Sequence, residues 1–186
     1  MKAAVVLSLI GVSVLAAQES PPDLQRELRH VLERKLATVV ESLDGVIGYA
    51  ALDLTSGEEI GRLEQQAFPT ASTIKLAILY ELFRQADDGR VALDTPAPLD
   101  RSQVVGGTGI LHALGTPALT PRDHAVLMMS LSDNTATNVL IDRVGFPAIA
   151  SRMQSLGLGG IRLRRKMMDG EAARRGEENV APPRAI

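Results

Sequence analysis

Residues 68–75 read Phe-Pro-Thr-Ala-Ser-Thr-Ile-Lys, and this stretch opens a helix with a hydroxyl and an amine on its first turn. From Ser72 onward apolar residues recur every three to four positions, until the pattern ends at Asp87-Asp88-Gly89. Side chains three residues apart on a helix are neighbours, so the amine of Lys75 can reach the hydroxyl of Ser72. A serine needs a nearby base to act as a nucleophile, and a desolvated lysine can supply one.

A second polar motif, Ser132-Asp133-Asn134, lies between two predicted helices. Thr120-Pro121-Arg122-Asp123 forms a capping box with proline at the first helical position, which predicts a helix to about Leu131. Another helix follows the motif and ends at Gly145. The motif can therefore project side chains into a cleft beside Ser72. Helix capping alone would explain one of its residues, but not the presence of both motifs in this order.

The remaining elements indicate an α/β (α+β) fold. Residues 23–43 carry apolar side chains at helical spacing and predict an amphipathic first helix. Residues 45–54 and 59–63 are short apolar stretches separated by a turn, which predicts a hairpin. Residues 149–156 predict one more helix. Strands at the start and helices afterwards are typical of that class.

The two motifs together resemble a known family. Residues 68–75 are similar to the nucleophile motif of class A serine β-lactamases, and residues 128–138 (Met-Met-Ser-Leu-Ser-Asp-Asn-Thr-Ala-Thr-Asn) are similar to their second motif. The resemblance, to the serine β-lactamase and penicillin-binding-protein superfamily, covers roughly residues 45–180. It implies an antiparallel sheet domain packed against an all-helical domain, with the site between them.

The N-terminal pattern and this resemblance together predict four segments. We expect a signal peptide in residues 1–17 and the N-terminal part of the α/β domain in 18–68. We expect the all-helical domain in residues 69–163 and a loop before the missing C-terminal strands in 164–186. The family's third motif, Lys-Thr-Gly, does not occur in the sequence. We therefore expect a C-terminally truncated chain with an incomplete sheet.

The resemblance also implies roles for individual residues. Ser72 would attack a lactam or peptide carbonyl, and Lys75 would take its proton. Ser132 would pass a proton to the leaving nitrogen, and Asn134 would hydrogen-bond the substrate amide. The structural residues expected near the site are Asp133, which braces its loop, and Asn138.

The expected function is that of a serine β-lactamase acting through an acyl-enzyme on Ser72. The alternatives are a penicillin-binding D-Ala-D-Ala peptidase-like protein and an inactive secreted relative. The alternatives stay open because class A enzymes activate the deacylating water with a Glu in a Glu-x-x-Leu-Asn loop. Here residues 164–169 read Arg-Arg-Lys-Met-Met-Asp. Glu171, Glu177 and Glu178 lie nearby without the required spacing.

Composition excludes several other classes. Met1-Lys2, an apolar run over residues 3–15 and Ala16-Ala17-Gln18 are typical of a secretory signal peptide, so we expect a secreted or periplasmic protein without stable membrane insertion. The absence of cysteine excludes disulfides and thiolate zinc sites. A net charge of −2 argues against a nucleic-acid partner.

Metal chemistry is also not indicated, because the three histidines, His30, His112 and His124, are scattered through the sequence. We expect no metal and no cofactor. The expected partner is a small molecule, a β-lactam or a peptidoglycan-stem-like substrate, bound by a monomer.

Overall fold

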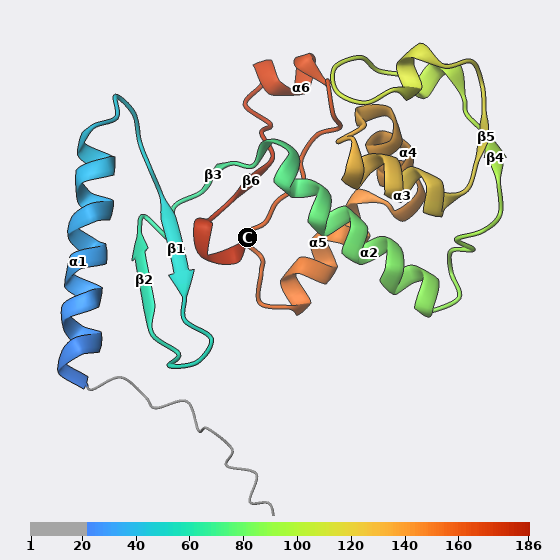
Figure 1. Cartoon of the computed structure of the whole chain (residues 1–186). Coiled ribbons are helices and arrows are strands. Elements are labelled where there is room, and N and C mark those ends of the chain that lie inside the picture. The colour runs from blue at the N-terminus through green and yellow to red at the C-terminus, as the bar shows by residue number, and fades with distance from the viewer. Residues whose placement is uncertain (1–21) are drawn as a thin grey trace, which may run out of the picture. The chain divides into compact units, whose positions relative to one another are not determined.

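A computed structural model describes residues 22–186 of the chain (Figure 1), so the predicted signal peptide lies outside the described residues. The chain forms two compact units, and the boundary between them in the sequence lies between Val46 and Ile47. In the first unit, helix α1 spans Pro22–Glu41, close to the predicted bounds. Within residues 22–186, no helix is both long and apolar enough to cross a membrane.

The second unit begins with the predicted hairpin. Strands β1 (Tyr49–Leu52) and β2 (Glu59–Arg62) pair antiparallel, with Tyr49 opposite Arg62. The turn between them is closed by Asp53, whose Oδ1 accepts a hydrogen bond of 2.8 Å from the backbone N–H of Thr55. In this turn a side chain accepts a hydrogen bond from the backbone two residues later. The turn lies where the sequence predicted one, between the two apolar stretches.

Two further antiparallel pairs are only two residues long. Strand β3 (Phe68–Pro69) pairs with β6 (Val180–Ala181), and β4 (Ala97–Pro98) pairs with β5 (Ala118–Leu119). The first pair matters for the site, because β3 ends three residues before Ser72. It ties the approach to the nucleophile to a segment more than a hundred residues later in the chain.

The helical part consists of five α-helices and four short 3₁₀ turns among the described residues 47–186. The α-helices are α2 (Lys75–Asp87), α3 (Pro121–Ser130), α4 (Asn134–Val144), α5 (Phe146–Ser155) and α6 (Gly170–Arg174). The 3₁₀ turns are η1 (Ala71–Ile74), η2 (Arg101–Gln103), η3 (Leu111–Ala113) and η4 (Pro183–Ala185).

The predicted capping box at the start of α3 is present. The Thr120 hydroxyl accepts from the backbone N–H of Asp123 at 3.0 Å, and the Asp123 carboxylate accepts from that of Thr120 at 2.9 Å. Each bond satisfies a donor that the first helical turn leaves free. The start of α3 therefore follows from local sequence.

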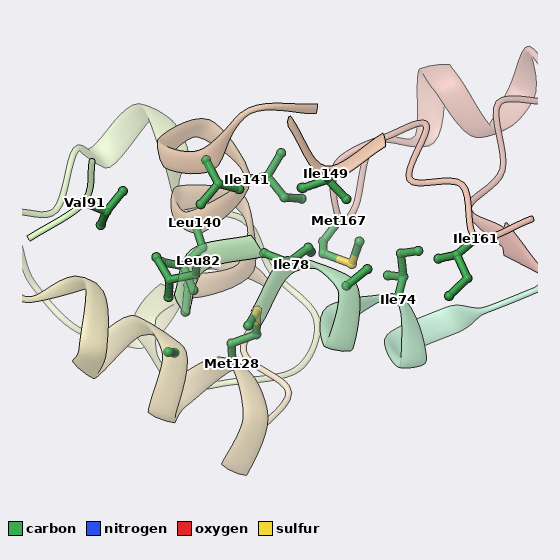
Figure 2. Packing of buried hydrophobic residues seen from close by; sticks show 14 of the residues in the cluster. Ile74, Ile78, Leu82, Val91, Met128, Leu140, Ile141, Ile149, Ile161 and Met167 are labelled. Atoms are coloured by element: carbon green, nitrogen blue, oxygen red, sulfur yellow. The ribbon is translucent and has the colours of Figure 1, made fainter. Parts of the chain in front are cut away.

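Helix α2 lies at the centre of the hydrophobic core. Its side chains Ile78 and Leu82, together with Ile74 before it, are fully buried against α3, α4 and α5 (Figure 2). Burying an aliphatic side chain contributes about 1.5–3 kcal/mol, so this row fixes the rotation of α2 firmly. Lys75, next to Ile74, is thereby turned inward, toward the start of α4. The arrangement of antiparallel strand pairs and packed helices agrees with the predicted α/β class and its incomplete sheet.

Candidate active site

A chain of hydrogen bonds joins the three predicted catalytic side chains. The hydroxyls of Ser72 and Ser132 lie 2.9 Å apart. The Lys75 amine donates to the Ser132 hydroxyl at 2.9 Å and to the Ser132 carbonyl at 2.7 Å. The fold thus brings together residues 60 positions apart in the sequence, and Ser132 stands between the amine and Ser72.

The environment of Lys75 suits a base. The residue is only 2% exposed, and its third hydrogen bond goes to Oδ1 of Asn134 at 3.2 Å. Burial lowers the pKa of the Lys75 ammonium, against the opposing charge of Asp133, which raises it. A buried amine loses its proton more readily than an exposed one because desolvation disfavours the charged form. The neutral Lys75 amine, formed more readily because of this burial, could accept a proton from a serine hydroxyl.

Asp133 acts as a brace inside the site. One carboxylate oxygen accepts from the backbone N–H groups of Ile110 and Leu111 at 2.7 and 2.9 Å. The other caps α4 by accepting from the N–H of Ala136 at 2.9 Å. The Asp133 carboxylate accepts three backbone N–H groups and is 1% exposed, so its hydrogen-bonding capacity is used within the protein.

The two asparagines hold the walls of the site. Besides binding Lys75, Asn134 donates from Nδ2 to the carbonyl of Gly106 at 3.2 Å. Asn138, one turn further along α4, forms a two-way bond with the backbone of Met167: Nδ2 donates to its carbonyl at 3.1 Å, and Oδ1 accepts from its N–H at 2.8 Å. Asn138 therefore fixes the loop after residue 163 against α4.

Thr108 is a site residue that the sequence reasoning missed. Its hydroxyl donates to the Ser132 carbonyl at 2.7 Å, and its own carbonyl accepts from the N–H of Asn134 at 3.1 Å. From the sequence, Gly106-Gly107-Thr108-Gly109 reads only as a turn-rich loop. The signal that could have found it is a hydroxyl residue flanked by glycines, which permits close approach of two backbones.

Asn179 organises the other border of the site and was also missed. Its Oδ1 accepts from the N–H groups of Arg164 and Arg165 at 2.8 and 3.0 Å, and its Nδ2 donates to the Arg165 carbonyl at 3.1 Å. Its backbone carbonyl accepts from the N–H of Thr70 at 2.9 Å. Asn179 thus connects residues 164–165 through its buried side chain with the segment that leads to Ser72 through its backbone carbonyl.

The carboxylates considered for deacylation are engaged elsewhere. Glu171 pairs with Arg174, Glu177 with Arg175 at 2.8 Å, and Glu178 with Arg165 at 2.7 Å. The part of the loop that faces the site carries Met168, whose sulfur lies beside Gly107. The side chain beside Gly107 is therefore a thioether and not a carboxylate.

Two of the four described non-glycine residues with positive φ are Ser132 and the residue that precedes Ser72. Ser132 has φ +53°, and Ala71, directly before Ser72, has φ +45°. Positive φ costs a residue with a Cβ of the order of 1–3 kcal/mol and persists where surrounding contacts enforce it. Such strain is often found at functional sites.

The histidines take no part in this cluster. His124 is buried with Nδ1 2.9 Å from the carbonyl of Thr120, His112 is exposed, and His30 lies on α1 beside Glu33. Among residues 22–186, no group of three or more metal-ligating side chains gathers.

Comparison with known proteins identifies the family of the chain. Residues 31–186 match the Beta-lactamase2 family, which is described as "Beta-lactamase enzyme family". The chain belongs to this family. Among curated members, it is 30% identical to Beta-lactamase L2 of Stenotrophomonas maltophilia over 65% of this chain and 40% of that protein. It is 27% identical to Beta-lactamase PSE-4 of Pseudomonas aeruginosa over its whole length and 63% of that protein.

Solved structures of the family share the fold. A β-lactamase from Sphaerobacter thermophilus superposes with a TM-score of 0.75 at 34% identity, over 82% of this chain and 57% of that one. PBP-A superposes with a TM-score of 0.74 at 28% identity, over 84% of this chain and 58% of that one. A mutant of PBP-A was solved as an acyl-enzyme complex with penicillin G. The chain therefore spans about three fifths of the length of these structures.

Proposed function

We propose that the protein is a serine hydrolase that opens β-lactams through an acyl-enzyme on Ser72. The observation that carries the proposal is the hydrogen-bond chain from Ser72 through Ser132 to the buried amine of Lys75. An activated nucleophile needs this pairing of a hydroxyl with a base at hydrogen-bond distance. Membership of the β-lactamase family supplies the substrate class.

In the proposed acylation, Ser72 Oγ bonds to the lactam carbonyl carbon while its proton moves to the Ser132 hydroxyl. The Ser132 proton moves to the neutral amine of Lys75. When the lactam C–N bond breaks, the nitrogen takes a proton back from Ser132, which is restored by Lys75. The product is an ester of Ser72 with the opened ring, and water must then cleave this ester to restore the enzyme.

A second candidate function differs only in that last step. Glu171, Glu177 and Glu178 pair with arginines, and Met168 lies at the wall of the site. Without a carboxylate to activate water, general base catalysis worth about 10²- to 10⁴-fold is lost from deacylation. This arrangement favours a penicillin-binding, peptidase-like protein that holds its acyl group for long periods.

Intact-mass spectrometry with penicillin G tests both candidates. Ring opening releases no fragment, so the adduct adds the whole mass of the antibiotic. We expect the adduct on the wild-type protein and on Ser130→Ala, which changes an exposed serine at the end of α3, but not on Ser72→Ala. Rapid loss of the adduct supports the β-lactamase, and persistence supports the penicillin-binding protein. A folded wild-type protein without an adduct contradicts the proposal.

Export is part of the same proposal. The N-terminal pattern over residues 1–17 supports cleavage before Gln18. A β-lactam acts outside the cytoplasmic membrane if its targets build the cell wall there, so a secreted or periplasmic protein would meet its substrate. Mass spectrometry of the protein isolated from the producing cell should give an N-terminus at Gln18, whereas one that retains Met1 would contradict export by cleavage.

A further inference from the structure

The Gly-Gly-Thr-Gly loop, residues 106–109, is fitted closely to the Ser-Asp-Asn motif. Gly107 and Gly109 have φ of +87° and +106°, values that residues with a Cβ rarely adopt. A Cβ on Gly107 would lie 2.6 Å from Nδ2 of Asn134, and one on Gly109 would overlap the Asp133 carboxylate. Both glycines therefore serve to bring the backbone of Thr108 against residues 132–134.

Thr108 contacts the motif on both sides of Asp133. Its hydroxyl donates to the carbonyl of Ser132, and its carbonyl accepts from the N–H of Asn134. The peptide unit between Ser132 and Asp133 cannot rotate without breaking the first bond. Because Ser132 is held at φ +53°, an outside contact has to maintain that orientation, and with it the direction of the Ser132 hydroxyl.

The same carbonyl binds the base. The Ser132 oxygen accepts from Thr108 Oγ1 and from Lys75 Nζ, each at 2.7 Å. A carbonyl oxygen has two lone pairs, so these donors saturate it. The Thr108 hydroxyl limits how strongly this oxygen can bind the charged ammonium, because the positive end of its O–H dipole lies at the shared acceptor.

We propose that Thr108 is a positioning residue for the acylation of Ser72. Thr108 fixes the Ser132 peptide, and it shares the Ser132 carbonyl, as an acceptor, with Lys75. This inference rests on the proposed acylation chemistry. The hydrogen bonds of Thr108 described above go to Ser132 and Asn134 and not to Ser72. The effect of Thr108 reaches the reaction through the direction of the Ser132 hydroxyl and through the proton affinity of the Lys75 amine.

Two effects follow when the hydroxyl is removed and the shape is kept, as in Thr108→Val. The acylation rate constant should fall about two- to tenfold, the range that corresponds to the net contribution of one hydrogen bond. The pH at which acylation is half-maximal should rise, because an unshared carbonyl binds the ammonium more strongly and raises the pKa of Lys75. The charged group that acts on this amine from the neighbouring loop is Asp133, and the substitution leaves it in place.

The test measures the rate of penicillin G adduct formation against pH, by quenched intact-mass spectrometry, on four proteins. These are the wild type, Thr108→Val, Thr108→Ser, which restores the hydroxyl, and Thr116→Val, which changes an exposed threonine of the same connection. We expect the slower rate and the higher half-maximal pH in Thr108→Val alone. Thermal unfolding of each variant checks that it is folded at the assay temperature.

The outcomes separate this inference from the proposed function. Acylation of the wild type together with an unchanged rate and pH profile in Thr108→Val overturns the role of Thr108 and leaves the function standing. A slower rate without a pH shift, not restored in Thr108→Ser, also overturns it, because loss of packing alone would produce that result. A folded wild type that penicillin G does not acylate overturns both. If Thr108→Val does not fold, a normal pH profile in Thr108→Ser together with a raised half-maximal pH in Thr108→Ala supports the role, and an unshifted Thr108→Ala contradicts it.

Discussion

Replacing Asp133 by alanine should destabilise the protein by about 4 kcal/mol. The substitution removes the acceptor of three backbone N–H groups, those of Ile110, Leu111 and Ala136. An N-cap is worth about 1 kcal/mol, and each of the other two donors costs about 1–3 kcal/mol when left without a partner. The estimate lies at the upper end of single substitutions because buried networks lose several bonds at once.

Urea unfolding measures this loss as a change in the midpoint at constant slope. The matched control is Asp169→Ala, because Asp169 caps α6 through the single N–H of Ala172 at 2.9 Å; we expect a loss of about 1 kcal/mol there. If Asp133→Ala lowers the free energy of unfolding no more than Asp169→Ala does, Asp133 is not the brace that joins residues 110–111 to the start of α4. Residues 110–111 and the start of α4 would then be held in place by other contacts.

Asp133→Asn separates charge from shape in the same position. The amide can still accept through its oxygen, so stability should fall less than in Asp133→Ala. The Asp133 charge raises the pKa of Lys75, so its removal lets burial lower that pKa further. The free amine then forms at lower pH, and the half-maximal pH of acylation should move down. A shift upward would contradict the electrostatic account of this pair.

Three other results are expected. Acylation of the wild type should rise with pH as the Lys75 ammonium, whose pKa burial lowers, loses its proton, and Lys75→Met should remove this rise and about 10²- to 10⁴-fold of the rate in a stopped mass assay; an unaltered profile would exclude Lys75 as the base. Gly109→Ala should cost about 3 kcal/mol in urea unfolding through strain and overlap, whereas Gly115→Ala, where a Cβ meets nothing within 4 Å, should change little; equal losses would contradict the close fit. Asn179→Ala should speed tryptic cleavage at the basic residues of its loop several-fold, since three hydrogen bonds to that loop disappear; unchanged proteolysis would show that the loop is held elsewhere.

Local sequence was sufficient for the elements that carry the site. Helix α3 begins where a capping box directs it, and α4 begins after an aspartate cap and ends at Gly145, whose φ of +85° suits glycine. The sequence proposed Ser72, Lys75, Ser132 and Asn134 as site residues from two motifs, and their roles stay predictions. In the fold, Ser132 contacts both Ser72 and Lys75, and Lys75 also contacts Asn134. The helix boundaries could be predicted because periodicity and capping act over a few residues.

Features set by tertiary contacts could not be predicted. A serine does not favour the left-handed conformation that Ser132 adopts, so its φ is imposed by Thr108, Lys75 and the neighbouring loops. The β3–β6 pair is too short to leave a pattern in the sequence. The network of Asn179 joins segments that are separated by 15 and 109 residues, and nothing local marks such a partner.

Peptide mapping of the acylated protein tests the central claim most directly. The protein is treated with penicillin G, denatured in acid and digested with trypsin, and the modified peptide is sequenced by mass spectrometry. The peptide 63–75 contains Ser72 as its only serine, and the peptide 123–143 contains Ser130 and Ser132. Our account predicts the adduct on Ser72 in peptide 63–75. An adduct in peptide 123–143, or elsewhere with Ser72 unmodified, would contradict the assignment of the nucleophile.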